Sequence, residues 1–223
     1  MEYPESSAEE PPRPHVVALM GSYRDGGAID EAIAVILEGA REEGARTDVI
    51  RLKDMDVEFC TNCRVCTHTP GLARGTCLIH DDQDQILRSL DGADAIVLGA
   101  PVNFGDVNAL TRRLLERMVG YAYWPEGAKA PALRDEATNK PAVLVSASAA
   151  PAIMTRTLMK PIRTLKQMAK LLHARPTGTL VLGFAGAGRG LTKRQIKRAR
   201  RLGWRLSHQA AKHPARPKHI AAL

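Results

Sequence analysis

Five short segments of the chain, most of them unbroken runs of apolar residues, have the character of β-strands. They cover residues 16–20, 47–52, 95–100, 142–145 and 179–184. Runs of this length are too short to span a membrane and are typical of strands buried on both faces of a parallel sheet. The pattern therefore predicts a five-stranded parallel sheet that is covered on both sides.

Between these segments, apolar residues recur every three or four positions, which is typical of helices packed on a sheet. We expect helices from Ala28, from Asp81 to Gly92, after Asp106, from Pro151 to about His173 with a kink at Pro161, and after Thr192. Alternating strands and helices predict an α/β fold, because right-handed crossovers place helices on both faces of the sheet. The expected fold is a doubly wound sheet with strand order 2-1-3-4-5.

The chain has 223 residues, of which 44% are hydrophobic, and this is enough for one sizeable domain. We expect that domain at residues 15–210, between a disordered tail at 1–14 and a basic tail at 211–223. The first tail carries glutamates and prolines in place of the basic start and apolar middle of a signal peptide. This composition favours a cytoplasmic protein without a membrane segment.

The loop after the first strand has the composition of an anion-binding loop. It contains Gly21, Gly26 and Gly27 together with Ser22 and Arg24, and a helix is expected directly behind it. Such a loop directs backbone N–H groups at a bound anion, and the helix N-terminus adds a partial positive charge. The sequence therefore favours a phosphate-binding loop over the alternative, a turn that binds nothing.

Two sequence motifs of known phosphate-binding loops are missing from this loop, which argues against two classes of ligand. It has no lysine followed by serine or threonine, which argues against a nucleoside triphosphate site. The spacing of its glycines does not match the dinucleotide fingerprint G-x-G-x-x-G either. A single phosphate group remains the best-fitting ligand.

Two segments, Gly21-Ser22-x-Arg24 and Pro101-Val102-Asn103-Phe104-Gly105, resemble the flavodoxin-like NAD(P)H-dependent FMN reductases. The resemblance implies a flavodoxin-like fold, FMN as cofactor and NAD(P)H as substrate. It also implies that three loops at the carboxyl ends of the strands bind FMN. The residues implied for the phosphate are Gly21, Ser22, Arg24, Gly26, Gly27 and Ala28; those for the flavin ring are Pro101, Val102, Asn103, Phe104 and Gly105 on one side and Ser146, Ala147 and Ser148 at the far edge.

The chain departs from that family's pattern at two positions. Gly27 stands where the family usually has serine or asparagine, which removes one side-chain contact to the phosphate. Asn103 stands where tyrosine is frequent, and Phe104 is the expected replacement as a stacking partner for the ring.

Four cysteines form a second specific pattern, within a long loop expected at residues 59–80. Cys60, Cys63 and Cys66 are each separated by two residues, and ten further residues separate Cys66 from Cys77. The spacing C-x-x-C-x-x-C supplies three thiolates to iron–sulfur clusters, with a fourth from elsewhere. The segment resembles the iron–sulfur flavoproteins, a branch of the same family with a 4Fe–4S cluster, although the gap before Cys77 is longer than usual there. Two other interpretations stay open: a zinc site, which prefers separated pairs, and cysteines that pack or act as redox-labile thiols.

The net charge of +8 suits anionic ligands and raises the question of nucleic acid binding. Much of the charge lies at residues 193–201 and 212–218, but an apolar helical stripe of Ile196, Ala199, Leu202 and Leu206 runs through the first of these. A solvated outer face on a last helix explains this pattern. With only 4% aromatic residues and no platform for base stacking, we expect no specific nucleic acid partner.

The sequence thus predicts an FMN-dependent oxidoreductase that takes electrons from NAD(P)H and passes them to a quinone, flavin, metal or other small-molecule acceptor. An iron–sulfur cluster is one route for those electrons. Because the flavin supplies the reactive atom, no separate catalytic residue is expected. The alternative is a non-enzymatic electron carrier of flavodoxin or iron–sulfur flavoprotein type, which the basic composition disfavours. A third hypothesis is a flavin-free scaffold that binds nucleic acid. We also expect a homo-oligomer, a dimer or a tetramer.

Overall fold

Five parallel strands form the central sheet of the protein, whose structure is a computed structural model describing residues 13–185 and 190–212. Neighbouring strands follow the order β2-β1-β3-β7-β8. This order confirms the predicted 2-1-3-4-5 arrangement. The strands are β1 (His15–Met20), β2 (Arg46–Arg51), β3 (Ala95–Asn103), β7 (Lys140–Ala147) and β8 (Ala174–Leu182).

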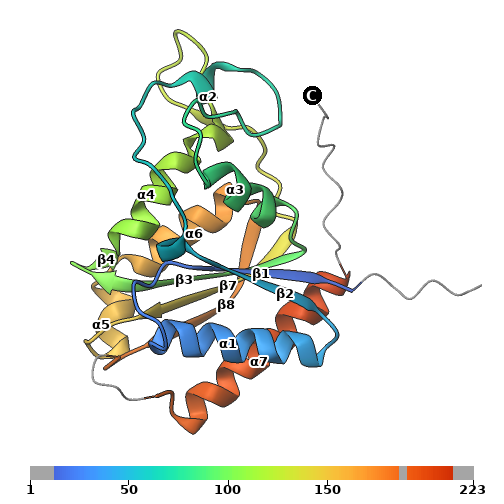
Figure 1. Cartoon of the computed structure of the whole chain (residues 1–223), viewed down its shortest axis with the longest axis vertical. Coiled ribbons are helices and arrows are strands. Elements are labelled where there is room, and N and C mark those ends of the chain that lie inside the picture. Colours follow the sequence, from blue (N-terminus) through green and yellow to red (C-terminus); the bar gives the residue numbers. More distant parts are fainter. Residues whose placement is uncertain (1–12, 186–189, 213–223) are drawn as a thin grey trace, which may run out of the picture.

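Helices cover both faces of the sheet, as Figure 1 shows. One face is covered by α1 (Ala28–Glu42) and α7 (Lys193–Lys212), and the other by α3 (Gln83–Asp91), α4 (Ala109–Arg117) and α6 (Pro161–Leu171). Alternate residues of β1 point to opposite faces, so Val17 and Leu19 join one hydrophobic core while Ala18 and Met20 join the other. The unbroken apolar runs follow from this double burial.

The segment after the third strand is a hairpin and not the expected five-residue turn. β3 continues to Asn103 and pairs antiparallel with β4 (Asp106–Val107), so only Phe104 and Gly105 form the turn, at φ of 49° and 80°. The prediction that Asp106 caps the next helix is wrong. Asn108 caps α4, because its side-chain oxygen accepts a hydrogen bond from the Thr111 N–H (3.3 Å).

The helix expected from Pro151 to His173 is two helices. α5 (Ala152–Thr157) ends before Pro161, which is the first residue of α6. Proline lacks an N–H donor and disfavours helical geometry in the preceding residue, so the expected kink is a complete break. Two other predicted helix ends are confirmed: Gly92 is the C-cap of α3, and Thr192 accepts from the Gln195 N–H (3.3 Å). The prediction that Asp81 caps α3 is wrong, because Asp82 is its N-cap and Asp81 accepts from the Gln83 N–H (3.0 Å) one residue earlier in the chain.

Short elements complete the described part of the chain. These are η1 (Leu52–Asp54), α2 (Val65–His68), η2 (Met118–Tyr121) and the hairpin of β5 (Ala122–Tyr123) with β6 (Ala132–Leu133). Within residues 13–185 and 190–212, no helix is both long and apolar enough to cross a membrane. The expected tails at 1–14 and 211–223 lie almost entirely outside the described residues.

Candidate functional site

An open cleft lies at the carboxyl end of the sheet, where the loops after β1, β3 and β7 meet. Its volume is about 1100 Å³, including the solvent at its mouth. The sequence-predicted residues that line it are Ser22, Arg24, Gly27, Ala28, Pro101, Val102, Asn103, Ala147 and Ser148. All three loops expected to bind the flavin therefore contribute to one cleft.

Five of the predicted residues, Gly21, Gly26, Phe104, Gly105 and Ser146, do not line this cleft. Gly21 and Ser146 are both hydrogen-bonded to β3: the Gly21 N–H donates to Gly99 O (2.8 Å), and Ser146 Oγ donates to Ala100 O (3.0 Å). The Phe104 side chain is fully exposed at the tip of the β3–β4 turn. Its ring is therefore not beside the cleft, where we expected it to replace a tyrosine.

The loop after β1 holds its shape through its own hydrogen bonds. Ser22 Oγ accepts from the Arg24 N–H (3.1 Å) and lies 3.2 Å from Arg24 O. No described residue accepts a hydrogen bond from the backbone N–H groups of Tyr23, Asp25 or Gly27. Because α1 begins at Ala28, directly behind the loop, its positive end adds to these donors. The loop can therefore bind a phosphate through its backbone.

Two acidic residues in the first turn of α1 would repel an anion, and both are held in contacts with the chain. Asp30 accepts from the Gly26 N–H (2.7 Å) and pairs with Arg51 (3.0 Å), and Glu31 accepts from the Leu191 N–H (2.9 Å). Burial by itself raises the pKa of Asp30, but Arg51 and the Gly26 N–H together hold that pKa below its ordinary value. Asp30 is thus an anion paired with a cation from β2.

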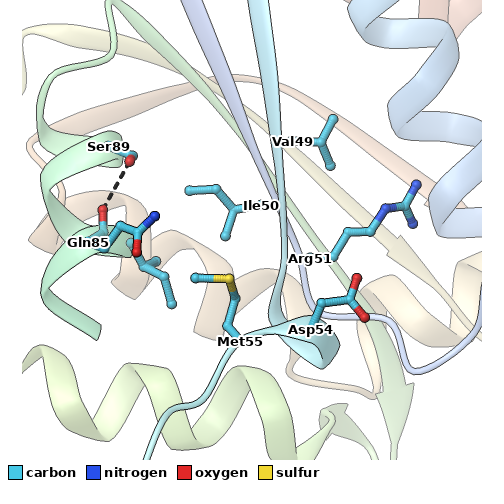
Figure 2. Close-up of a pocket in the computed structure, with 8 residues that line it drawn as sticks. Val49, Ile50, Arg51, Asp54, Met55, Gln85 and Ser89 are labelled. Carbon is cyan, nitrogen blue, oxygen red and sulfur yellow. Dashed lines mark hydrogen bonds between the residues drawn. The ribbon is translucent and has the colours of Figure 1, made fainter. Parts of the chain in front are cut away.

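Arg51 also borders a separate pocket between β2 and α3. Figure 2 shows its guanidinium turned away from the apolar side chains of Ile50 and Met55 and toward α1. The side chain therefore serves the first loop and not that pocket.

The four cysteines line a second pocket, of about 440 Å³ including the solvent at its mouth. Cys77 therefore lines the same pocket as the other three cysteines, although ten residues separate it from Cys66. The Asn62 N–H donates to Cys60 Sγ (3.4 Å). Burial raises the pKa of the Cys66 thiol, and the three neighbouring cysteines raise it further.

The backbone of the cysteine segment is strained. Asn62 and Arg64 have φ of 54° and 64°, a region that side chains other than glycine rarely occupy. Turns with such residues expose successive N–H groups and are common around phosphates and iron–sulfur clusters. This conformation is compatible with an electron-rich ligand beside the segment.

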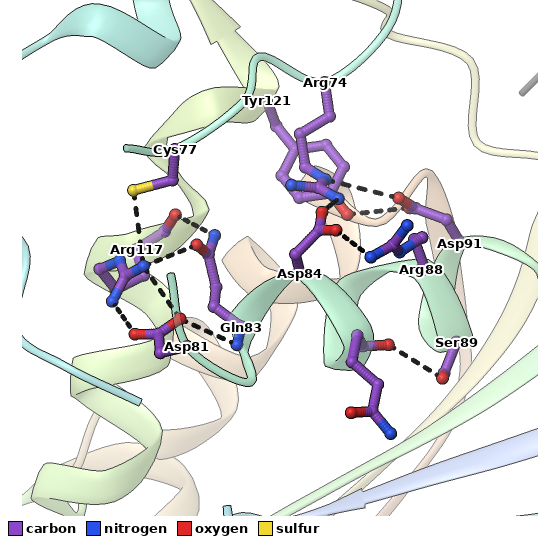
Figure 3. A network of polar contacts seen from close by, with 11 residues as sticks. Arg74, Cys77, Asp81, Gln83, Asp84, Arg88, Ser89, Asp91, Arg117 and Tyr121 are labelled. Carbon is purple, nitrogen blue, oxygen red and sulfur yellow. Dashed lines mark hydrogen bonds and ion pairs between the residues drawn. The ribbon is translucent and has the colours of Figure 1, made fainter. Parts of the chain in front are cut away.

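Arg117, at the end of α4, connects the cysteine pocket to a buried polar network (Figure 3). Its side chain and that of Asp81 are 0% and 1% exposed and form an ion pair of 2.5 Å. The second guanidinium nitrogen donates to Cys77 Sγ (3.4 Å) and to Gln83 Oε1 (2.9 Å). Arg117 therefore ties the sulfur of Cys77 to this buried network.

The two sites lie at opposite ends of α4. At the N-terminal end, Asn108 Nδ2 donates to Gly21 O (2.5 Å), and at the C-terminal end Arg117 contacts Cys77. A helix of nine residues is about 13 Å long. The cysteine segment lies away from the sheet edge that carries the three loops of the cleft, because Figure 1 shows α2 beyond the far end of α4.

The donor set fits an iron–sulfur cluster better than zinc. Within residues 13–185 and 190–212, no three His, Cys, Asp or Glu side chains are gathered closely enough to hold one metal ion. The thiolates of a 4Fe–4S cluster each bind a different iron, whereas those of a zinc site meet on a single ion. Here four thiols surround one pocket, and two of the sulfurs accept a hydrogen bond from an N–H group. This matches the arrangement of thiolates around a 4Fe–4S cluster.

Most of the chain matches a known protein family. The family model of the NADPH-dependent FMN reductases matches residues 14–187. The chain belongs to this family. Both the three loops of the cleft and the cysteine segment fall within the matched residues.

Among curated proteins, the chain is similar to iron–sulfur flavoproteins. It is 36% identical over 102 residues to one from Methanocaldococcus jannaschii and 32% identical over 104 residues to one from Methanosarcina thermophila. These alignments cover 46% and 47% of this chain and 50% and 52% of the relatives. The chain thus spans about half the length of the curated relatives it matches.

Solved structures of reductases share the fold of this FMN reductase family member. An NAD(P)H:quinone oxidoreductase from Methanothermobacter marburgensis superposes with a TM-score of 0.66 at 18% identity, over 87% of this chain and all (100%) of the other. A flavone reductase gives a TM-score of 0.62 at 18% identity, over 88% of this chain and 62% of the other. The fold is flavodoxin-like, and at this identity these likenesses show the fold alone.

Sequence reasoning missed several residues of both sites. Tyr23, Ile29, Ala149 and Ala185 line the cleft. Tyr23 is the variable position of the motif quoted for the first loop, so its place in the loop was the signal. Arg117 lacks a comparable signal, because a charged residue at the end of an amphipathic helix is usually a solvated one.

Proposed function

We propose that this chain is an FMN-dependent oxidoreductase that takes electrons from NADH or NADPH and passes them to a quinone, flavin, metal or other small-molecule acceptor. The observation that carries the proposal is the cleft, where three loops at the switch point of the sheet surround one open space. Three N–H groups of the first loop have no hydrogen-bond acceptor among the described residues. Family membership supports this class of function. The names of the structural relatives, a quinone oxidoreductase and a flavone reductase, agree with it.

Within this proposal, each loop has a separate role. The N–H groups of the loop after β1, with Arg24, bind the FMN phosphate, and Ser22 acts mainly by fixing the loop. Pro101, Val102 and Asn103 flank one side of the ring, and Ala147 and Ser148 its far edge. FMN held in this way would supply the two-electron redox chemistry between the nicotinamide and the acceptor. The chain's own contribution is to orient the ring and to leave one face open.

A flavin titration tests the binding site. The double variant Ser22→Ala and Arg24→Ala should bind FMN several-fold more weakly, measured by quenching of flavin fluorescence. Riboflavin, which lacks the phosphate, should bind the variant and the wild type equally. Arg41→Ala, an exposed arginine in the last turn of α1, is the matched control. Equal losses for both flavins, or no quenching by the wild type, would contradict the assignment.

We further propose that Cys60, Cys63, Cys66 and Cys77 hold a 4Fe–4S cluster. The shared pocket, the N–H donors to two sulfurs and the similarity to iron–sulfur flavoproteins support this. Anaerobic preparations should contain iron and acid-labile sulfide near one cluster per chain, and Cys63→Ala should lose most of both. Near-zero iron in the wild type, with unaltered flavin content and reductase rate in Cys63→Ala, would show that the cysteines are structural.

An electron carrier is the second candidate function, favoured by the similarity to iron–sulfur flavoproteins and by the flavodoxin-like fold. The net charge of +8 disfavours it, because flavodoxin-type carriers are typically acidic. The two candidates differ in one observable: only the reductase accepts hydride directly from a nicotinamide. A cytoplasmic location belongs to the proposal in either case.

A further inference from the structure

Arg134 is a buried arginine whose hydrogen-bond partners are all backbone carbonyl oxygens. Only 8% of the residue is exposed. Its Nε donates to Gly120 O (2.9 Å), Nη2 to Cys66 O (3.0 Å), and Nη1 to Thr69 O (2.6 Å) and Gly71 O (3.0 Å). In the described part of the chain it forms no ion pair with a carboxylate. Burying a guanidinium without a counter-charge is unfavourable, so four well-placed carbonyls are needed to hold it.

Three of these four carbonyls belong to the cysteine segment and to the gap that precedes Cys77. Arg134 thereby fixes the chain from Cys66 to Gly71 against the turn at Gly120. Arginine can make these bonds because its guanidinium is a rigid, planar group with several N–H donors. Lysine has one nitrogen and cannot reach separate carbonyls in fixed directions.

A second contact, at Gly75, fixes the chain where it runs back toward the cysteine pocket. The Gly75 N–H donates to Gly120 O (2.9 Å), the same oxygen that Arg134 binds. A Cβ atom at Gly75 would collide with the carbonyl oxygen of Cys66, so the two backbones approach closely only because residue 75 is glycine. Cys77 follows two residues later, where Arg117 meets its sulfur.

We propose that Arg134 is a positioning residue that closes the gap between Cys66 and Cys77 and so completes the four-thiol site. The inference rests on the proposed cluster. It explains how a chain with ten residues in this gap still presents Cys77 to the same pocket as the other cysteines. The charge of Arg134 adds to the effect, because four thiolates around a cluster are electron-rich and this buried cation has no carboxylate partner among the described residues.

The test measures how firmly the FMN-loaded protein retains iron. Cluster absorbance and iron per chain are followed against increasing chelator in the wild type, Arg134→Met, Arg134→Lys and the exposed control Arg163→Met. Both Arg134 variants should lose the cluster at a chelator concentration about tenfold or more below the one that the wild type withstands. This is the effect expected when a group that orients a ligand is removed. FMN content should stay at the wild-type value, and Arg163→Met should match the wild type throughout.

A double-mutant cycle separates positioning of Cys77 from a general structural role. If Arg134 acts through Cys77, then Arg134→Met should change iron retention little in a Cys77→Ala background, and the residual cluster of Arg134→Met should give the electron paramagnetic resonance spectrum of Cys77→Ala. Additive losses would overturn the inference, as would full retention of iron by either Arg134 variant. Should Arg134→Met fail to fold, Gly75→Ala disturbs the same closure and must show the same loss of iron at unchanged FMN. Wild-type protein that binds FMN but no iron would overturn this inference and the cluster while leaving the flavin proposal intact.

Discussion

Asp81 and Arg117 form a buried ion pair that is favourable because both partners are also hydrogen-bonded elsewhere. The carboxylate of Asp81 accepts from the Glu58 N–H (2.8 Å) and the Gln83 N–H (3.0 Å) in addition to the arginine. Buried pairs gain stability only with such additional partners, since removing two charges from water is costly. The pair also holds Arg117 against Cys77, so it links fold stability to the cysteine pocket.

Removing one partner of this pair should be costly. Asp81→Asn leaves the guanidinium of Arg117 buried without its counter-charge, and we expect the free energy of unfolding to fall by about 3–5 kcal/mol. Chemical denaturation at neutral pH measures it, with the exposed Asp56→Asn as control. A loss no larger than that of the control would contradict the assignment.

The same pair predicts a dependence of stability on pH. Burial by itself raises the pKa of Asp81, but hydrogen bonds from Arg117, Glu58 and Gln83 hold it below the ordinary 3.8. A carboxyl with a lowered folded-state pKa contributes its stability above the unfolded pKa and loses it as the pH falls through the folded pKa. The stability difference between wild type and Asp81→Asn should therefore be constant at neutral pH and shrink below about pH 4. A difference that grows toward acid pH would be inconsistent with an ionised Asp81.

Arg51 acts on the phosphate loop through Asp30, so its loss should be felt by FMN and not by riboflavin. Arg51→Met leaves Asp30 as an uncompensated anion in the first turn of α1. A surface charge at a helix end is worth about 0.3–1 kcal/mol, which corresponds to roughly a two- to fivefold weaker FMN affinity. Fluorescence titration with both flavins measures this, and a matching loss for riboflavin would argue for a change in the ring site instead.

At the level of elements, helices α1 and α7 cross with their backbones in close contact. A Cβ atom at Gly203 of α7 would collide with the carbonyl oxygen of Ile36 in α1. Alanine ordinarily stabilises a helix interior by about 1 kcal/mol relative to glycine. Here we expect Gly203→Ala to destabilise the protein by about 1–3 kcal/mol, because overpacking outweighs propensity. Thermal unfolding checks the sign, with the exposed Arg201→Ala as control; a raised midpoint for Gly203→Ala would contradict this crossing.

Elements defined by their own apolar pattern could be predicted, and elements defined by contacts with distant residues could not. The strands were visible in the sequence because burial on both faces leaves an unbroken apolar run. The β3–β4 hairpin was missed because Pro101 and Asn103 are typical turn residues, yet here they extend a strand. The cleft was predictable because a parallel sheet brings its loops to one edge. Arg117 and Arg134 were not, since their roles depend on carbonyl and sulfur atoms far away in the sequence.

At the scale of the whole molecule, the length of α4 separates the cleft from the cysteine pocket, and several large apolar side chains are exposed on the surface. Ile153, Leu158, Phe104 and Phe184 are all more than 60% exposed, at 65%, 72%, 109% and 63%. The Lys160 N–H donates to Gly105 O (2.7 Å), which ties the start of α6 to the hairpin tip. Exposed apolar patches often mark interaction sites, so we place the contact of the predicted homo-oligomer here.

The oligomer remains a prediction, and sedimentation of the wild type should give a mass of two or four chains. The double variant Ile153→Glu and Leu158→Glu should shift that mass toward one chain, because it places charges in the proposed interface. Leu72→Glu, at an exposed residue of the cysteine segment, is the control. A wild type that sediments as a single chain at all concentrations would refute the prediction.

The central claim is that the cleft holds FMN for direct reduction by a nicotinamide. Rapid mixing of FMN-loaded protein with NADH and with NADPH, without oxygen, tests it most directly. The account predicts that the oxidised flavin absorbance bleaches with at least one of the two, at a rate that saturates with nicotinamide concentration. Dithionite is the control, because it should bleach the flavin in either case. If dithionite bleaches the flavin but neither nicotinamide changes its spectrum, the claim is contradicted and the electron carrier remains.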